Sequence, residues 1–242
     1  MEAPEPCSPG TEAVELRECI EELTYFTLRS HLTGATHLLL SNHFCSTLLE
    51  SGDYKKLALS LDDCISRGGF RVDDGEEEKR IGEWSQLVEE EGSVLANVYK
   101  SVNFQLHVQE PYFTQLKDGL KAVEGRCAAG DYNRIRPGAF VLVNKCLVLE
   151  VQDVHRYASF YEMLKEEGLD RVLPGVSTIE EGVAVYRKFY TEGKEKSNGV
   201  LGICVTVSAS QPYISLARIL SGLGDRGILM LMHPPASRSN TD

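Results

Sequence analysis

The most informative segment of the chain reads Gly119-Leu120-Lys121-Ala122-Val123-Glu124-Gly125-Arg126. It places one acidic and two basic side chains on a short stretch that follows a helix-ending glycine. Because side chains alternate between the two faces of a β-strand, a strand here puts Glu124 and Arg126 on one face and Lys121 on the other. A twist or bulge near Gly125 would re-aim the end of the strand and bring the three charges to one mouth. The segment therefore predicts either a binding site or a structural ion pair.

The residues on the N-terminal side of this segment show a strand followed by a helix. Apolar side chains at every second position from Phe104 to Val108 indicate a half-buried strand. Pro111 suits the first turn of a short helix over 112–118, and Gly119 ends that helix. The charged segment therefore lies on the second strand of its domain.

The chain then continues with a hairpin, two helices and a last strand. Asn144-Lys145 is typical of a tight hairpin turn, and the apolar run after it predicts a strand at the centre of a sheet. Ser159 and Thr178 each begin a capping-box pattern, with Glu three residues later. The later strands are expected at 139–143, 146–154 and 199–207. This order predicts an α+β fold, a small β-barrel with an inserted pair of helices.

The first hundred residues show the periodicity of amphipathic helices, so we expect an all-α N-terminal region. Asp53 is a candidate cap of its third helix, which Gly68-Gly69 ends. An acidic stretch separates this region from the barrel. The expected parts are a disordered N-terminus at 1–10, the helical region at 11–100 with an acidic connector near 73–80, the barrel domain at 101–208, and a C-terminal helix with a disordered tail at 209–242.

The net charge of −11 is unevenly distributed over the 242 residues. Residues 1–100 hold 9 Lys and Arg against 20 Asp and Glu, whereas residues 101–230 hold 15 of each. A large nucleic-acid-binding surface needs a basic face, so this balance of charges allows only a small, local nucleic-acid-binding surface. The acidic helices favour contact with protein over contact with nucleic acid.

The chain has neither a secretory leader pattern at its N-terminus nor an apolar run of the roughly 18 residues that a membrane span requires. Its seven cysteines lack paired spacing, which is typical of reduced thiols. We therefore expect a soluble intracellular protein, in the cytoplasm or the nucleus.

Metal and cofactor motifs are weak. Zinc sites favour compact pairs such as Cys-x-x-Cys, which the chain lacks, and no Gly-rich phosphate loop is present. We therefore expect no metal and no cofactor. The residues nearest to a metal-site composition are His31, His37, His43, Cys45, Cys19 and Cys64.

The pattern Gly-x-Lys-x-x-Glu-x-Arg of the charged segment resembles the motif of the ASCH family (activating signal cointegrator homology), small β-barrel domains of the PUA-like superfamily. The resemblance covers about residues 103–208 and is strongest to plant RNA-binding ASCH proteins, which carry an N-terminal helical extension. Supporting segments are Pro111-Tyr112-Phe113, Arg136-Pro137-Gly138, Tyr157-Ala158-Ser159-Phe160, Pro174-Gly175 and Glu180-Glu181-Gly182.

In this family the cleft beside the motif is the proposed ligand surface, and RNA is the proposed ligand. The resemblance implies that Lys121 holds a phosphate or polarises a carbonyl, and that Arg126 stacks on a base or pairs with a phosphate. Glu124 either accepts from the exocyclic amine of a base or only neutralises Arg126. The further candidates for contact with RNA or a nucleotide-like ligand are Tyr112, Arg134 and Arg136.

Two other functions stay open. Some bacterial members of the family are amidohydrolases that remove the acetyl group of N4-acetylcytidine with a Lys and a Thr of the motif strand. Lys121 occupies the matching Lys position, but Glu124 stands where these enzymes have Thr, and Glu cannot supply the same hydroxyl. A Lys–Glu pair still suits acid–base work if burial shifts its pKa values. The third possibility is a non-enzymatic scaffold that binds a protein through its N-terminal helices.

Overall fold

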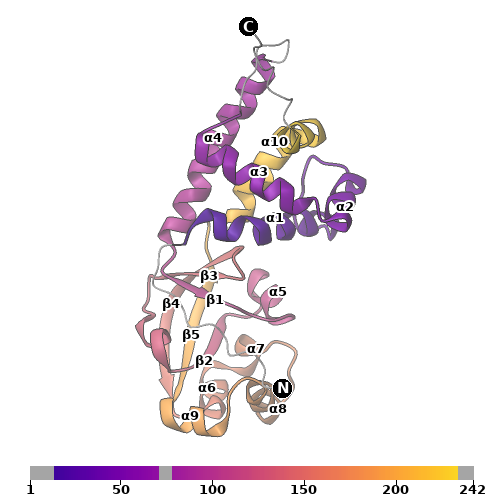
Figure 1. Ribbon diagram of the computed structural model, residues 1–242. Coiled ribbons are helices and arrows are strands. Elements are labelled where there is room, and N and C mark those ends of the chain that lie inside the picture. Colours follow the sequence, from indigo (N-terminus) through magenta and orange to yellow (C-terminus); the bar gives the residue numbers. More distant parts are fainter. Residues whose placement is uncertain (1–13, 71–77, 234–242) are drawn as a thin grey trace. The chain divides into compact units, whose positions relative to one another are not determined.

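The computed structural model describes residues 14–70 and 78–233, and these form two compact units (Figure 1). One unit spans Val102–Ala209. The other joins the helices that precede it, Val14–Ser101, to the described part of the chain after Ala209. The expected disordered N-terminus at 1–10, most of the acidic connector near 73–80, and the tail after residue 233 lie outside the described residues.

The helical unit contains both the N-terminal helices and the last helix of the chain. The C-terminal helix packs against the first, third and fourth helices, and it buries Leu216, Leu220 and Leu223. These leucines recur at helix spacing, so one stripe of the last helix completes the core of this unit. The helices are α1 (Leu16–Leu32), α2 (Asn42–Ser51), α3 (Tyr54–Arg67), α4 (Glu78–Ser101) and α10 (Pro212–Met232).

Local signals set some of the ends of these helices, and one expected cap is absent. Ser41 caps α2, because its hydroxyl accepts a hydrogen bond from the backbone N–H of Phe44 at 3.1 Å. Gly68 ends α3 in the left-handed conformation, with φ +73°. The expected side-chain cap by Asp53 is wrong, because this carboxylate instead accepts from the Ser51 hydroxyl at 2.8 Å.

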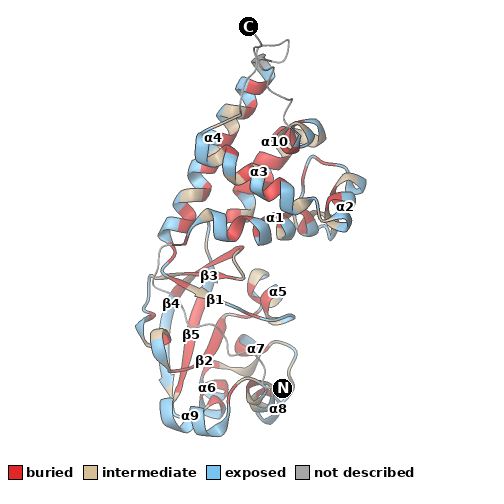
Figure 2. Ribbon diagram, in the orientation of Figure 1, coloured by how far each residue is buried: buried red, intermediate tan, exposed pale blue. Residues whose placement is uncertain are grey.

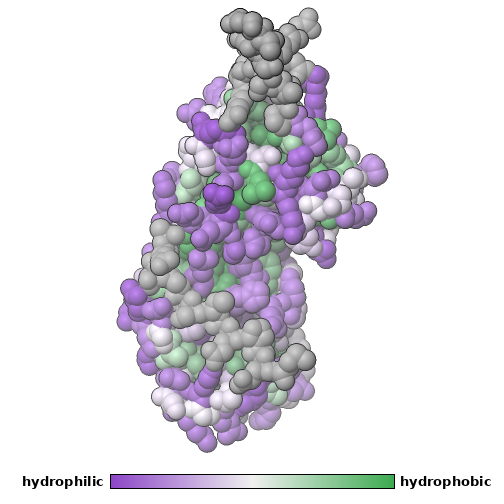
Figure 3. Space-filling model, viewed as in Figure 1, coloured by the Kyte–Doolittle hydropathy of each residue, from purple (hydrophilic) through white to green (hydrophobic). Residues whose placement is uncertain are grey.

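The surface of the helical unit is mostly hydrophilic on the face drawn in Figure 3, with scattered apolar side chains. Within the described residues, no helix is both long enough and apolar enough to cross a membrane. Large apolar side chains that this unit leaves exposed are Tyr25, Leu39, Leu59, Val94, Ile214 and Leu229.

The second unit is built on a curled sheet whose strands run in the order β1-β3-β4-β5-β2 (Figure 1). β1 pairs with β3 in parallel, and the other pairs are antiparallel. Figure 2 shows β2, β3 and most of β5 buried, whereas β4 is buried mainly in its first half. β4 lies at the centre of the sheet, as its apolar run predicts. The predicted α+β class is confirmed, as a five-stranded half-barrel with helices. The strands are β1 (Phe104–Leu106), β2 (Val123–Cys127), β3 (Phe140–Val143), β4 (Leu147–Tyr157) and β5 (Val200–Val207).

The β3–β4 hairpin follows from its turn residues. Asn144 and Lys145 both have positive φ angles, 48° and 60°, and the pairing of Val143 with Leu147 closes the turn. Asn tolerates this left-handed conformation better than most residues. The turn thus sets the register of the two central apolar strands.

More helices cover the sheet than the sequence predicts. Thr178 forms the complete capping box, with its hydroxyl and the Glu181 carboxylate each accepting a backbone N–H. Ser159 forms only half of one, because the Glu162 carboxylate accepts from Ala158 instead. The helices of this unit are α5 (Tyr112–Lys117), the short 3-10 helix η1 (Gly130–Arg134), α6 (Phe160–Glu167), α7 (Leu169–Val172), α8 (Ile179–Arg187) and α9 (Glu192–Asn198).

Helices α6 and α8 pack closely together, and both contact the edge strand β2 at Gly125. The rings of Phe160 and Tyr186 stack with their centroids 4.2 Å apart. A methyl group added at Gly125 would lie 2.7 Å from the Met163 side chain and would also collide with the Tyr186 hydroxyl. Only glycine at this position leaves room for that hydroxyl against the strand.

We therefore expect Gly125→Ala to destabilise the second unit by about 1–3 kcal/mol, because overpacking displaces Tyr186 and Met163. Chemical denaturation followed by near-ultraviolet circular dichroism measures this loss. Gly193→Ala is the matched control, since the nearest atom to an added methyl there is 3.9 Å away on an exposed helix. Equal stability of the two variants would contradict the packing assigned to Gly125.

Candidate ligand-binding pocket

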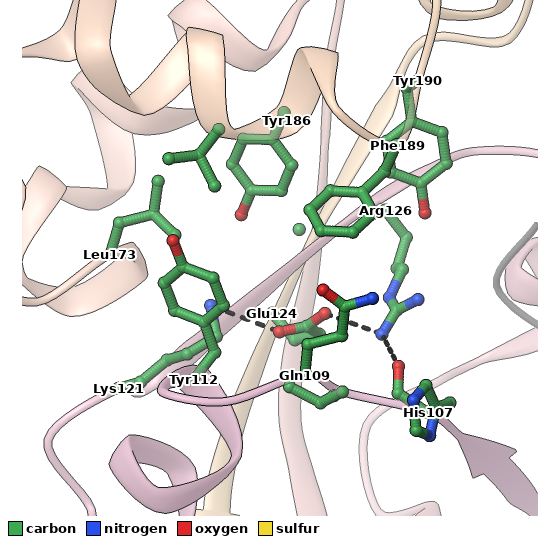
Figure 4. Close-up of a pocket in the computed structure, with 13 residues that line it drawn as sticks. His107, Gln109, Tyr112, Lys121, Glu124, Arg126, Leu173, Tyr186, Phe189 and Tyr190 are labelled. Carbon is green, nitrogen blue, oxygen red and sulfur yellow. Dashed lines mark hydrogen bonds and ion pairs between the residues drawn. The ribbon is translucent and has the colours of Figure 1, made fainter. Parts of the chain in front are cut away.

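The structure brings the three charges of the motif together in one buried cluster (Figure 4). The Glu124 carboxylate lies 3.2 Å from Lys121 Nζ and 2.9 Å from Arg126 Nη2, and each of the three side chains is less than a tenth exposed. The expectation that Lys121 points to the opposite face is wrong. β2 begins at Val123, so Lys121 precedes the strand and the alternation rule does not govern it.

The ammonium group of Lys121 has all its donors occupied. It donates to the backbone carbonyl of Val123 at 2.7 Å and to that of Val172, in α7, at 2.5 Å. The Glu124 carboxylate takes the third N–H. A lysine has three donors, so Lys121 would have to release one of these partners in order to hold a ligand.

Arg126 links the edge strand to the segment after β1. Its Nη2 donates to the backbone carbonyl of His107 at 2.8 Å, and its guanidinium lies 5.7 Å from the centroid of the Tyr132 ring. The Nε of Arg126 is buried and has no hydrogen-bond partner in the described part of the chain. This donor is therefore available to a ligand or a water molecule.

The charges of the cluster shift one another's pKa values. Burial raises the pKa of the Glu124 carboxyl, but the two cations outweigh burial and hold that pKa below its usual value. Burial lowers the pKa of Lys121, although the carboxylate of Glu124 opposes this shift. At neutral pH Glu124 is therefore a carboxylate, and the cations of Lys121 and Arg126 lie in contact with its two oxygens.

A cavity of about 190 Å³ lies beside the cluster, and aromatic side chains form much of its wall (Figure 4). The Tyr186 hydroxyl at this wall is buried and lacks a hydrogen-bond partner among the described residues. The cavity therefore offers apolar ring surface together with a few unsatisfied polar atoms, which is typical of a small-molecule site. The side chains that line it beside the charged cluster include Gln109, Tyr112, Leu173, Tyr186, Phe189 and Tyr190.

The six residues predicted to contact a ligand do not all reach this cavity. Tyr112 lines it with the three charged residues, and its ring centroid lies 5.9 Å from Lys121 Nζ. Arg134 and Arg136 are absent from its described lining. Arg134 is exposed and pairs with Asp131 at 3.5 Å, and Arg136 donates to nearby backbone carbonyls in its own loop. Contact of any of these residues with RNA stays a prediction.

Sequence reasoning missed the far wall of the cavity, which consists of Tyr186, Phe189 and Tyr190. Their spacing of three and four residues is the one available signal, because such positions share a side of a helical segment. That spacing alone does not distinguish a pocket wall from core packing, and Tyr186 also stacks in the core. The position of α8 against β2 had to be known first.

The histidines and cysteines of the N-terminal helices do not gather into a metal site within the described residues. His31 accepts a hydrogen bond from the backbone of Leu38, and its ring lies 6.0 Å from that of His37. The thiols of Cys19, Cys45 and Cys64 are buried in the helical unit.

The curled sheet and its helices define a small α+β domain with a charged, aromatic-walled pocket. The family model of the ASCH domain matches residues 106–207, so this part of the chain belongs to the ASCH family. The chain is 41% identical to the hypothetical protein PH0355, with 43% of this chain and 97% of that one covered and a TM-score of 0.42. For protein PF0455 from Pyrococcus furiosus the identity is 40%, the coverage 43% and 96%, and the TM-score 0.40. A search of curated proteins gave no match.

We expect Glu124→Gln to destabilise the second unit by about 3–5 kcal/mol, because it leaves two buried cations without an anion. Urea denaturation at neutral pH measures the loss. Glu192→Gln is the control, since Glu192 pairs with Lys196 at 3.6 Å on the surface, where such a pair contributes little.

The pH dependence of this difference tests its cause. The pKa of Glu124 is lower in the folded state than the ordinary value of 4.5, so its stabilisation is complete above about pH 4.5 and is lost as the pH falls through the folded pKa. The gap between wild type and Glu124→Gln should therefore shrink below pH 4.5. A gap that stays constant down to pH 2 would contradict the assigned charge effect.

Proposed function

We propose that the ASCH domain binds RNA by taking one unstacked base into the pocket beside Lys121, Glu124 and Arg126. One observation carries this proposal: a cavity of about 190 Å³ combines aromatic walls with a buried carboxylate. Proteins that recognise single-stranded RNA commonly stack bases on aromatic rings and read their edges with hydrogen bonds. Kinship with plant RNA-binding ASCH proteins is part of the proposal and rests on the helical N-terminal region.

The hydrogen-bonding capacity of the cluster favours a base over a phosphate. A carboxylate has about four acceptor positions, and Glu124 uses one oxygen for each cation, so it retains capacity for a donor of the ligand. The ammonium group of Lys121 has no N–H donor left for a ligand. A phosphate carries only acceptors and would meet this carboxylate, whereas the amino group of cytosine, adenine or guanine can donate to it.

The dimensions of the pocket fit one flat ring. A cavity of about 150 Å³ is known to hold a benzene molecule, so about 190 Å³ accommodates a heterocycle of similar size. Tyr112 and Phe189 supply ring surface on two sides of the carboxylate in Figure 4. The Tyr186 hydroxyl and Arg126 Nε add polar atoms that a base edge can satisfy.

Contacts with the RNA backbone would come from outside the pocket. Tyr132, on η1, lies beside Arg126, and Arg134 on the same short helix has a side chain that is 61% exposed. We propose Arg134 and Arg136 as phosphate contacts. Because such contacts are few, the logarithm of the binding constant should fall only modestly with the logarithm of the salt concentration. The slope of this plot reports the number of phosphates neutralised.

Binding of short single-stranded RNA to the full chain, measured by fluorescence anisotropy, tests the proposal. We expect Phe189→Ala to weaken binding by about 1–3 kcal/mol, which is the usual contribution of one stacked base. Tyr161→Ala is the matched control, because Tyr161 is an aromatic residue 46% exposed on α6 and is absent from the described lining of the pocket.

The base preference adds a second measurement to the same experiment. Homopolymers of cytidine or adenosine should bind more tightly than those of uridine, since uracil lacks an exocyclic amine for Glu124. Equal loss of affinity in Phe189→Ala and Tyr161→Ala, or no binding at low salt, would overturn the proposal.

Amidohydrolysis of N4-acetylcytidine is the second candidate, and one observation favours it. A lysine whose pKa is lowered by burial lies 3.2 Å from a carboxylate at the edge of a cavity, as acid–base catalysis requires. Against it stands the saturated hydrogen bonding of Lys121, and the lack of a hydroxyl at the position of Glu124.

We therefore expect the full chain to bind N4-acetylcytidine without releasing acetate. Incubation at several pH values, with acetate and cytidine quantified by chromatography, measures turnover. Release of acetate that is lost in Lys121→Arg, but kept in Lys117→Arg as a surface-lysine control, would instead establish the enzyme. Lys117 suits this purpose because it pairs with Asp118 outside the pocket.

The helical unit supports a further part of the proposal, contact with a protein partner. Its acidic composition disfavours nucleic acid, and it exposes several large apolar side chains, of which Leu39 is 78% exposed and Leu59 62%. The barrel would then bind RNA while the helices bind protein.

A further inference from the structure

A second cluster of polar side chains lies in the ASCH domain, on the sheet face that α6 covers. His155 on β4, Glu167 at the end of α6, and Cys204 on β5 each offer one potential ligand atom to this cluster. These three atoms all lie within 4.8 Å of one another. None of the three residues belongs to the described lining of the pocket beside Lys121.

From this geometry we infer a Zn²⁺ site formed by His155 Nδ1, a Glu167 carboxylate oxygen and Cys204 Sγ. Catalytic and other open zinc sites use three such protein ligands and leave a fourth position for water. With bonds of about 2.0–2.3 Å, a tetrahedral ion holds its ligand atoms about 3.3–3.8 Å apart. Cys204 Sγ lies 3.7 Å from Glu167 Oε2, which matches this separation, whereas His155 Nδ1 lies 2.6 Å from Glu167 Oε1 and has to move apart from it when an ion enters.

The backbone leaves space for this cluster. Asp153 pairs with Cys204 across β4 and β5, and His155 pairs with Gly202, so these side chains share one face of the sheet. A methyl group added at Gly202 would lie 3.2 Å from the Glu167 carboxylate. A side chain opposite His155 would therefore push the carboxylate by a few tenths of an ångström.

Both ring nitrogens of His155 face carboxylates, and this arrangement requires an additional positive charge at the ring. Its Nδ1 lies 2.6 Å from Glu167, and its Nε2 lies 3.1 Å from Asp153. A neutral imidazole has one N–H, so it can donate to only one of these carboxylates. A cation beside the other nitrogen resolves the conflict, either as a second proton on the ring or as a metal ion.

The surrounding residues supply the support that metal ligands usually have. Asp153 can accept the Nε2–H of His155, which orients the ring and leaves Nδ1 to the ion, and the Tyr157 hydroxyl donates to Glu167 at 2.8 Å. Carboxylate partners of this kind on the second ring nitrogen are a regular feature of zinc-binding histidines. The side chain of His155 is 46% exposed, so an ion can enter from solvent.

The donor set selects the kind of ion. Thiolate and imidazole ligands favour Zn²⁺, whereas Mg²⁺ and Ca²⁺ require oxygen ligands. Binding releases the thiol proton of Cys204 to solvent, and the resulting thiolate with the Glu167 carboxylate balances the two charges of the ion. Arg171 lies 3.5 Å from Glu167, but its side chain is 55% exposed and can turn into solvent.

Titration of the chelator-treated full chain with Co²⁺ tests this inference, because a cobalt–thiolate bond gives a charge-transfer absorption band in the near ultraviolet. We expect one equivalent of Co²⁺ to bind and to produce this band. Added Zn²⁺ should displace the Co²⁺ and remove the band. Cys204→Ser should abolish the band, and Asp153→Asn should weaken Zn²⁺ binding by about 10–100-fold.

The controls are Cys146→Ser and His43→Ala, a buried thiol of the same unit and an exposed histidine of the other, which should leave Co²⁺ binding unchanged. The inference is overturned if the wild-type protein does not bind Co²⁺, or binds it without the sulfur band. The positive charge beside His155 would then be a second proton on its ring. This outcome does not depend on whether any variant folds.

Discussion

The buried contact of Lys121 and Arg126 with Glu124 is the constraint on which the pocket depends. Three charges removed from water carry a desolvation cost, and each must therefore find protein partners. Those partners come from separate segments: the carbonyl of His107 after β1, and the carbonyl of Val172 in α7. The charged cluster thus ties these segments to the edge strand β2, and the cavity is the space that remains between them.

The sequence predicts the elements that local interactions determine. The hairpin turn at Asn144 and Lys145, the capping box at Thr178 and the shared face of Glu124 and Arg126 all depend on neighbouring residues, and the structure contains each of them. The error about Lys121 has the same origin. A period of two applies only within a strand, and the motif does not show that β2 begins at Val123.

Contacts between distant segments could not be predicted in this way. The aromatic wall at Tyr186 and Phe189 exists because α8 packs against β2. Gly125 leaves room for this packing, but its neighbours are known only from the folded unit. The cluster of His155, Glu167 and Cys204 joins residues that are 12 and 37 positions apart. No compact ligand spacing marks it, so the sequence alone does not indicate a metal site there.

Two of the buried carboxylates of the ASCH domain, Glu124 and Glu167, are linked by the single turn of α7. Arg171 pairs with Glu167, and the next residue, Val172, accepts the hydrogen bond of Lys121. The carbonyl of Arg171 also accepts from the backbone of Ala122, at 2.8 Å, within the motif segment itself. A helix of four residues has too little core of its own to resist these contacts, so they determine its position. An ion that drew Glu167 away from Arg171 would therefore act on the same turn that supports Lys121, so the proposed zinc site and the pocket beside Lys121 share this part of their framework.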